Sequence, residues 1–203
     1  MSGGSPPFDL RRREFEQLRQ LIYAKTGIHL TDRKRPLVVS RLSRRLRALG
    51  MEGFDTYYRY VAEQDAGGGE LREMINAITT NKTSFFREPH HFAFLRERVV
   101  PEIMAAARRG RPRRLRIWSA GCSSGQEPYS IAATLRNQIG LEDWDVRILA
   151  TDIDTNVLAE AEAGEYPLSA HDEVPEGLRR RFFPCKDGKV MAAGVLRDMV
   201  AFR

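Results

Sequence analysis

Two short apolar runs, separated by a helical segment, constrain the fold of this chain more than any other feature. Residues 115–120 (Leu-Arg-Ile-Trp-Ser-Ala) and 146–150 (Val-Arg-Ile-Leu-Ala) have the length and the β-branched content of strands. A Gly-Cys-Ser-Ser-Gly turn and a helix over about 128–139 are expected between them. A second helix is expected over about 155–163, where Gly164 is placed to end it. This alternation of strands and helices predicts a parallel sheet of the doubly wound type.

Residues 8–80 have a different pattern, because their apolar side chains recur at helical spacing. A first helix is expected from about residue 8 to Gly27, and Pro36 can begin a second one that continues to about Leu49. Two more helices are expected over about 56–64 and 70–79, with a glycine-rich turn between them. The sequence therefore predicts a small all-α bundle at 8–80, a linker and helix at 81–114, and an α/β domain at 115–203.

Positive charge is concentrated in the N-terminal part of the chain. The net charge is +6 and the isoelectric point about 9.6, yet residues 1–50 contain 12 Lys and Arg against 4 Asp and Glu, while the rest contains 21 against 23. In the second helix, Leu42, Leu46 and Leu49 form an apolar face. The opposite face is basic and contains Arg41, Arg44 and Arg47. Such a patch fits an anionic partner (nucleic acid, lipid headgroups or an acidic protein surface), or it is simply a solvated face.

Several features exclude other classes of function. No segment has 18 uninterrupted apolar residues, so no insertion into a membrane is expected. Residues 1–7 lack the apolar stretch of a secretory signal and are expected to be a flexible lead-in. Cys122 and Cys185 have neither metal-ligand spacing nor a disulfide framework, which favours a reducing cytoplasm. The four histidines form no ligand set, so no metal is expected: His29, His90, His91 and His171.

The turn after the first strand has the composition of a ligand-binding turn. Gly121 and Gly125 flank small residues, so a ligand can approach the backbone N–H groups at the start of the following helix. Asp152 follows the second strand, where an acidic side chain can accept both hydroxyls of a ribose. The spacing from Gly125 to Asp152 is longer than the roughly 20 residues of the dinucleotide fingerprint. A tight turn followed by an Asp that caps a helix is the alternative interpretation.

Four motifs together resemble one known family. They are Thr-Asn-x-Thr-Ser-Phe-Phe-Arg-Glu-Pro at 80–89, the segments 117–132 and 150–158, and the basic helix at 40–50. Phe85 and Phe86, within the first motif, are most simply explained as core packing. In order and spacing, from about residue 10 to 203, these motifs resemble the CheR-type chemotaxis receptor methyltransferases, whose catalytic domain is Rossmann-like.

The resemblance implies a cofactor, a substrate and a site. The cofactor would be S-adenosylmethionine, released as S-adenosylhomocysteine, and the acceptors would be glutamate carboxylates on the cytoplasmic methylation helices of chemoreceptors. The implied cofactor contacts are Asn81, Thr83, Arg87, Glu127 and Asp152, with Arg87 also acting in catalysis. The implied receptor-binding residues are Arg41, Arg44, Arg45 and Arg47. One departure is visible, since the family usually has Glu where this chain has Lys82, although that side chain can point outward.

The resemblance favours a monomeric cytoplasmic enzyme that binds no nucleic acid. A nucleic-acid methyltransferase is the competing class, because a basic chain with this cofactor also suits RNA or DNA; a non-catalytic receptor-binding product is a third. Residues 199–203 are expected to begin a third strand, and the family's fourth strand and small β-subdomain are expected to be absent from 1–203. The chain alone is therefore expected to be incomplete and inactive, with a marginally stable C-terminal half.

Overall fold

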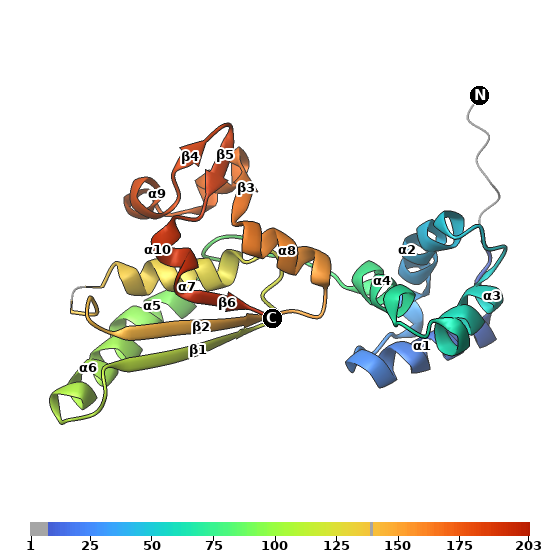
Figure 1. Cartoon of the computed structure of the whole chain (residues 1–203), viewed down its shortest axis with the longest axis horizontal. Helices are drawn as coiled ribbons and strands as arrows, with labels where there is room; N and C mark the ends of the chain where they lie inside the picture. The colour runs from blue at the N-terminus through green and yellow to red at the C-terminus, as the bar shows by residue number, and fades with distance from the viewer. Residues whose placement is uncertain (1–7, 139) are drawn as a thin grey trace. The chain divides into compact units, whose positions relative to one another are not determined.

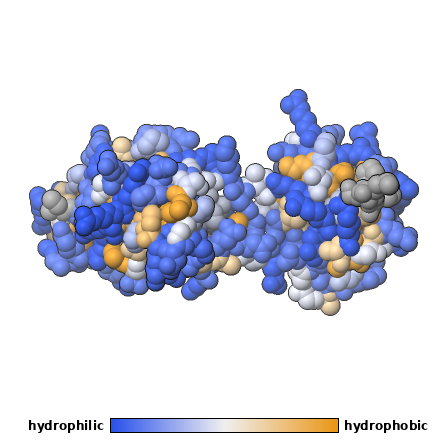
Figure 2. Space-filling model, turned by 90° about the horizontal axis from the view of Figure 1, so that it is seen from above, coloured by the Kyte–Doolittle hydropathy of each residue, from blue (hydrophilic) through white to orange (hydrophobic). Residues whose placement is uncertain are grey.

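The computed structural model describes residues 8–138 and 140–203, which form two compact units that divide between Thr80 and Asn81 (Figure 1). The expected lead-in at 1–7 and the expected helix end at Ile139 lie outside the described residues. Seen from one side, the surface of each unit is mostly hydrophilic with small hydrophobic patches (Figure 2).

The first unit is the predicted all-α bundle. Its helices are α1 Arg12–Thr26, α2 Arg35–Ala48, α3 Phe54–Arg59 and α4 Gly69–Ile78, with a 3-10 turn η1 Asp32–Lys34 and a π-helical turn η2 Tyr60–Gln64. Gly27 ends α1 in the left-handed conformation, with φ of 73°. The apolar sides of the helices share one core that contains Leu18, Ile22, Leu42, Leu46, Phe54 and Met74. Leu49, expected on the apolar face of α2, is 37% exposed because it lies just beyond the helix end.

The second unit contains the predicted parallel sheet. Its strands are β1 Arg114–Ala120, β2 Asp145–Thr151 and β6 Val200–Phe202, in the order β1-β2-β6, so the expected third strand pairs with the second. Side chains alternate between two faces: Ile148 and Ala150 are buried, whereas Leu149 is 42% exposed. The helices α7 Gln126–Arg136 and α8 Thr155–Ala163 lie on one side of the sheet (Figure 1).

Helix α7 provides much of the core of this unit. Tyr129, Ala132, Ala133 and Leu135 are buried, and the helix ends at Arg136, earlier than expected. The stretch that leads into β1 is helical over α5 Pro89–Phe94, the π-helical turn η3 Leu95–Val99 and α6 Val100–Arg108. A short helix α10 Gly194–Arg197 precedes β6.

The part of the sequence between α8 and β6 forms a small antiparallel sheet. It consists of β3 Glu165–Pro167, β4 Cys185–Lys186 and β5 Lys189–Met191, in the order β3-β5-β4, with a 3-10 turn η4 Leu168–Glu173 and a helix α9 Glu176–Phe182. The expectation that 1–203 contains no small β-subdomain is therefore wrong. These strands have two or three residues each, too few for an alternating pattern to be read. The signal that was available is Asp187-Gly188, whose φ values of 49° and 75° make the tight hairpin turn between β4 and β5.

Candidate functional site

The turn after β1 is held against the end of β2 by backbone hydrogen bonds. The N–H groups of Gly121 and Cys122 donate to the carbonyl oxygen of Thr151 at 2.8 and 2.9 Å. Both flanking glycines have left-handed backbone, with φ of 75° at Gly121 and 92° at Gly125, but for different reasons. A Cβ at Gly121 would meet open space, whereas one at Gly125 would lie 2.9 Å from Ala161 Cβ. Gly125 thus serves the packing of α7 on α8, and Gly121 leaves the surface beside the strand ends open to a ligand.

Asp152 lies at the carboxyl end of β2 with its carboxylate held by two backbone donors. Its Oδ2 accepts from the N–H of Ser123 at 2.8 Å and its Oδ1 from the N–H of Asp154 at 3.0 Å. Each carboxylate oxygen has a second lone pair, and the side chain is half-buried, so further hydroxyl donors can be accepted. The helix cap is a different residue: Asp154 accepts from the N–H of Asn156 at 3.0 Å and begins α8. The capping alternative therefore applies to Asp154 and not to Asp152.

Residues 81–87 are held to the rest of the second unit by side chains from three places in the fold. Asn81 Nδ2 donates to Asp154 Oδ2 at 2.6 Å, at the start of α8. The N–H of Phe85 donates to Glu173 Oε2 at 2.8 Å, and that of Phe86 donates to Ser130 Oγ at 3.0 Å. Ser130 lies on α7 and Glu173 on η4. The structure thus brings Asn81 and Asp152 together through Asp154, a residue that the sequence interpretation did not assign to the site.

Aromatic packing and backbone strain fix the shape of this segment. Phe85 is buried against the rings of Tyr166 and Phe183, with centroids 4.8 Å away in both cases, which confirms its expected packing role. Phe86 and Glu88 have left-handed backbone with φ of 52° and 58°, a conformation that costs a non-glycine residue roughly 1–3 kcal/mol. Such strain concentrates at functional sites, where the surrounding contacts hold it in place. No feature of the sequence indicated it.

The remaining predicted residues of the segment are more exposed. Arg87 is exposed, and its Nη1 donates to the carbonyl oxygen of Lys82 at 2.8 Å, which closes the segment on itself. The Lys82 side chain is exposed and Thr83 is half-buried. Lys82 therefore adds a surface charge.

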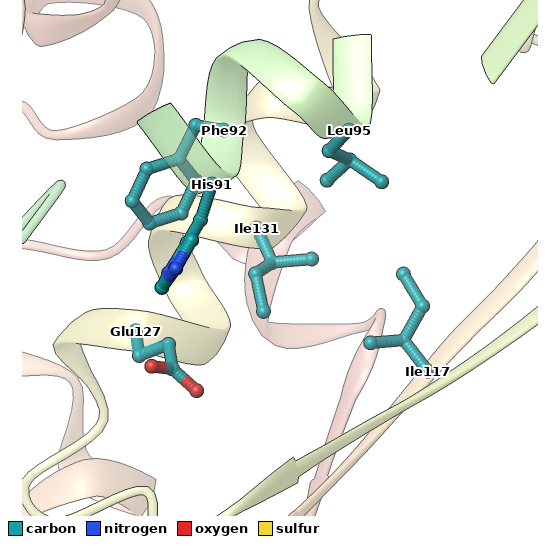
Figure 3. A pocket seen from close by; sticks show the side chains of 6 residues that line it. All are labelled: His91, Phe92, Leu95, Ile117, Glu127 and Ile131. Carbon is teal, nitrogen blue, oxygen red and sulfur yellow. The ribbon is translucent and has the colours of Figure 1, made fainter. Parts of the chain in front are cut away.

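Glu127 lies in the first turn of α7 and faces a cavity of about 250 Å³ (Figure 3). Its Oε1 accepts a hydrogen bond from Ser119 Oγ at 2.7 Å, so the end of β1 orients the carboxylate. The cavity is apolar on most sides, and the imidazole of His91 is its other polar group: the lining residues are His91, Phe92, Leu95, Ile117, Glu127 and Ile131. An apolar cavity with a carboxylate in its lining suits a ligand that combines apolar and cationic groups.

The charge around the turn fits a ligand with hydroxyls and a positive centre. The pKa of the Cys122 thiol is raised to about 11, first by burial and then by the negative charges of Asp152 and Glu127. Ser123 Oγ is buried and has no hydrogen-bond partner among the described residues. Such a hydroxyl costs free energy unless a ligand or water satisfies it. Two carboxylates that act on Cys122 and one buried hydroxyl without a partner among the described residues thus belong to this turn and its surroundings.

The predicted basic face of α2 divides into two pairs of residues. Arg41 Nη1 donates to the carbonyl oxygens of Ala77 at 3.3 Å and Ile78 at 2.6 Å, and also to that of Thr79, while its Nη2 donates to Thr80 Oγ1 at 3.2 Å. These carbonyls form the C-terminal end of α4, where a cation compensates the helix dipole and the unpaired acceptors. Arg41 thus stabilises the last turn of α4 and the two residues that precede Asn81.

Arg45 is likewise engaged within the bundle. Its Nε donates to Glu70 Oε1 at 3.0 Å, and the buried Glu70 also accepts from the hydroxyl of Tyr57 at 2.8 Å. Arg44 and Arg47 are exposed, and the Arg47 guanidinium lies 5.7 Å from the centroid of the Phe8 ring. The exposed part of the basic face is therefore formed by Arg44 and Arg47.

The fold and the site indicate the class to which the protein belongs. A parallel sheet with a glycine turn after its first strand and a carboxylate after its second is the arrangement found in α/β domains that bind ribose-containing cofactors. Residues 13–79 match the family model described as "CheR methyltransferase, all-alpha domain", and residues 81–203 match "CheR methyltransferase, SAM binding domain". The chain belongs to the CheR methyltransferase family, and its cofactor is S-adenosylmethionine.

Relatives from several bacteria support this assignment. The chain is 44% identical over 204 residues to "Chemotaxis protein methyltransferase 2" of Pseudomonas aeruginosa, an alignment that covers 98% of the chain and 70% of the relative. Identity to the "Chemotaxis protein methyltransferase" of Borreliella burgdorferi is 36%, covering 96% and 70%. Identity to the "Chemotaxis protein methyltransferase" of Salmonella typhimurium is 45%, and the alignment covers 83% of the chain and 55% of the relative. In the described part of the chain, no helix has the length and apolar character needed to cross a membrane.

Proposed function

We propose that this chain carries the cofactor-binding and receptor-facing parts of an enzyme that methylates glutamate side chains of chemoreceptors in the cytoplasm. The observation that carries the proposal is the convergence of Asn81, Glu127 and Asp152 around the carboxyl ends of β1 and β2. The names of the relatives, chemotaxis protein methyltransferases, support methyl transfer in chemotaxis, and glutamate as the acceptor comes from the family resemblance. The product would be a glutamate methyl ester together with S-adenosylhomocysteine.

The residues of the site suit binding and orientation better than acid–base chemistry. The cofactor supplies an electrophilic methyl group on a sulfonium. Asp152 holds the ribose hydroxyls, Glu127 holds the positive amino end, and Asn81 and Thr83 contact the same end from the linker segment. An acceptor glutamate, with an ordinary pKa of about 4.3, is already ionised at neutral pH and needs no general base. Alignment of the reacting atoms can then lower the barrier by up to about 7–11 kcal/mol.

Arg87 is proposed to orient the acceptor carboxylate. Its guanidinium is anchored by one nitrogen to the carbonyl of Lys82, and the side chain is exposed. An Arg held at one end by the backbone presents its other donors in a fixed direction, which suits bidentate recognition of a carboxylate. Since a guanidinium stays protonated in proteins, it acts by charge and geometry and not by proton transfer.

Arg44 and Arg47 are proposed to contact the acidic methylation helices of the receptor. They are exposed, whereas Arg41 and Arg45 support them from within the bundle by fixing α2 against α4. Electrostatic complementarity of this kind raises the association rate and fixes orientation more than it raises affinity. A protein surface is favoured over nucleic acid, which the names of the relatives do not suggest.

Transfer of labelled methyl groups to a receptor fragment tests the proposal. A chimera in which residues 1–203 replace the matching part of the Pseudomonas aeruginosa relative is incubated with methyl-labelled S-adenosylmethionine and a receptor cytoplasmic fragment. The expected product is base-labile and releases methanol, as a carboxyl methyl ester does. A receptor fragment whose acceptor glutamates are replaced by glutamine is the matched control and should take up no label. Label that is base-stable, or that appears equally on the control, would contradict a glutamate ester.

A further inference from the structure

Asp154, the second acidic residue of the Thr-Asp-Ile-Asp sequence, contacts both sides of the cofactor site. It is only 3% exposed. Its Oδ2 accepts from Asn81 Nδ2 at 2.6 Å, its Oδ1 accepts from the N–H of Asn156 at 3.0 Å, and its own N–H donates to Asp152 Oδ1 at 3.0 Å. One buried residue therefore connects the linker segment, the start of α8 and the ribose carboxylate.

These contacts exceed what a helix cap requires. A capping side chain needs one acceptor for the free N–H groups of the first turn, and a serine or threonine supplies it as well as an aspartate does. The second oxygen of Asp154 is directed to a residue that lies 73 positions away in the sequence. A carboxylate is the shortest side chain that offers two acceptor atoms to two separate donors.

The contact also selects one orientation of the Asn81 amide. A carboxamide can present either its NH₂ group or its oxygen in a given direction. Because Asp154 accepts from Nδ2, the Asn81 oxygen is the atom directed away from Asp154. Further along, the segment is held by the backbone N–H groups of Phe85 and Phe86 and by the packing of their rings, whereas Asn81 itself is held by the carboxylate of Asp154.

We propose that Asp154 is a positioning residue for cofactor binding: it fixes the distance between Asn81 and Asp152 and makes Asn81 present an acceptor oxygen to the cofactor. This inference rests on the proposed assignment of Asn81 and Asp152 as cofactor contacts. Asp154 itself does not touch the cofactor and acts through these two neighbours.

The substitution Asp154→Ser separates positioning from capping. Serine retains the cap of α8 but is too short to reach Asn81. In the 203-residue chain we expect affinity for S-adenosylhomocysteine, measured by calorimetry, to fall about tenfold or more, as expected for a lost hydrogen bond to a charged group. The melting temperature should fall less than that of Asp154→Ala, because the cap is kept. Asp154→Ala should lose affinity and also melt at a lower temperature, because the cap is lost as well.

A double-mutant cycle tests whether Asp154 acts through Asn81. In an Asn81→Ala background, Asp154→Ser should cost little further affinity, because the contact is already absent. Asp65 supplies the matched control: it also accepts backbone N–H groups at a helix start, from Gly69 and Leu71 at 3.0 and 2.7 Å, but belongs to the other unit. Asp65→Ser should leave the affinity unchanged.

The possible outcomes are separable. Wild-type affinity in Asp154→Ser, or effects of the two substitutions that simply multiply, would overturn the positioning role while leaving the proposed function intact. Failure of the unmodified chain to bind S-adenosylhomocysteine would overturn the proposed site together with this inference. If Asp154→Ser does not fold, Asp154→Asn replaces it: this side chain of equal size has one acceptor oxygen for two donors, and unchanged affinity in it would also overturn the role.

Discussion

Two aspartates separated by one residue have different tasks in this site. Asp152 presents a half-buried carboxylate held by the N–H groups of Ser123 and Asp154, whereas Asp154 is buried and caps α8. The sequence led to the proposed ribose contact of Asp152 because an acidic residue follows the second strand. It could not assign Asp154, since its partner Asn81 is distant in sequence and is brought near only by the tertiary fold.

Asp152→Ala should weaken cofactor binding by about 1–3 kcal/mol, because the ribose hydroxyls lose their acceptor in a partly dry site. The measurement is calorimetric titration with S-adenosylhomocysteine, with thermal melting in parallel to confirm that the variant is folded. Glu142→Ala, which removes an exposed carboxylate bonded to the N–H of Gly140, is the control and should bind normally. Equal affinity in wild type and Asp152→Ala would refute the ribose assignment.

The two cysteines should differ in reactivity. Burial raises the pKa of Cys122 to about 11, whereas Cys185 is exposed. The thiolate is the reactive form, so iodoacetamide at pH 8 should modify Cys185 and leave Cys122 unmodified, as measured by mass spectrometry of peptides. Since the folded-state pKa of Cys122 is raised, its contribution to stability is present at neutral pH and is lost as the pH rises through about 11. Equal labelling of both thiols in folded protein would contradict the burial of the Cys122 side chain.

At the scale of elements, the local sequence pattern was sufficient wherever an element is long. The periodicities of α1, α2, α7 and the two longer strands gave their positions to within a few residues. The small β3-β5-β4 sheet was missed because its strands have two or three residues, and its Asp187-Gly188 turn was the only local signal. The left-handed backbone at Phe86 arises from tertiary contacts that no local pattern encodes.

For the basic helix α2, the spacing of the arginines predicted that they lie on the outer face. It could not show which of them form hydrogen bonds within the bundle, because these bonds depend on the tertiary fold. We expect Arg44→Glu with Arg47→Glu to slow receptor methylation and reduce its sensitivity to salt, with little change in stability, since both side chains are exposed.

Arg41→Ala should instead lower the free energy of unfolding by about 1–3 kcal/mol, because the carbonyls at the end of α4 lose their donor.

Two measurements on the chimera distinguish the exposed arginines from the arginines bonded within the bundle. Chemical denaturation gives the free energy of unfolding, and initial rates of methyl transfer at several salt concentrations give the electrostatic contribution. Arg41→Lys, which keeps the charge but not the multiple donors, should fall between wild type and Arg41→Ala in stability. A double Arg44/Arg47 variant that methylates receptors at the wild-type rate would show that this face is only solvated.

At the scale of the whole molecule, the two units have separate hydrophobic cores. The buried residues of the bundle and those of the α/β unit form distinct clusters, and every hydrogen bond of the site described above lies within residues 81–203. The bundle therefore has the means to fold by itself, whereas the stability of the other unit depends on its own sheet and helices. The family matches divide at the same place, with one at 13–79 and the other at 81–203.

The sheet of the second unit exposes apolar side chains on the face opposite α7 and α8. Trp118 is 68% exposed and Leu149 42%, and with Ala201 they border a hollow of about 380 Å³ on that face. Within the described residues, β1 pairs only with β2, so its outer edge offers free backbone donors and acceptors. An exposed apolar face beside an unpaired edge is a surface on which copies of a chain associate.

We therefore expect the 203-residue polypeptide, studied by itself, to self-associate as its concentration rises. Sedimentation velocity over a concentration series measures the association, and the fluorescence of Trp118 should shift to shorter wavelength as the face becomes covered. Leu149→Lys should weaken the association, because it places a charge on the apolar face. Leu168→Lys, at a position that is 51% exposed in η4 and away from the sheet, is the matched control and should leave the association unchanged. A polypeptide that stays monomeric throughout the series would show that neither the exposed face nor the free edge of β1 drives association.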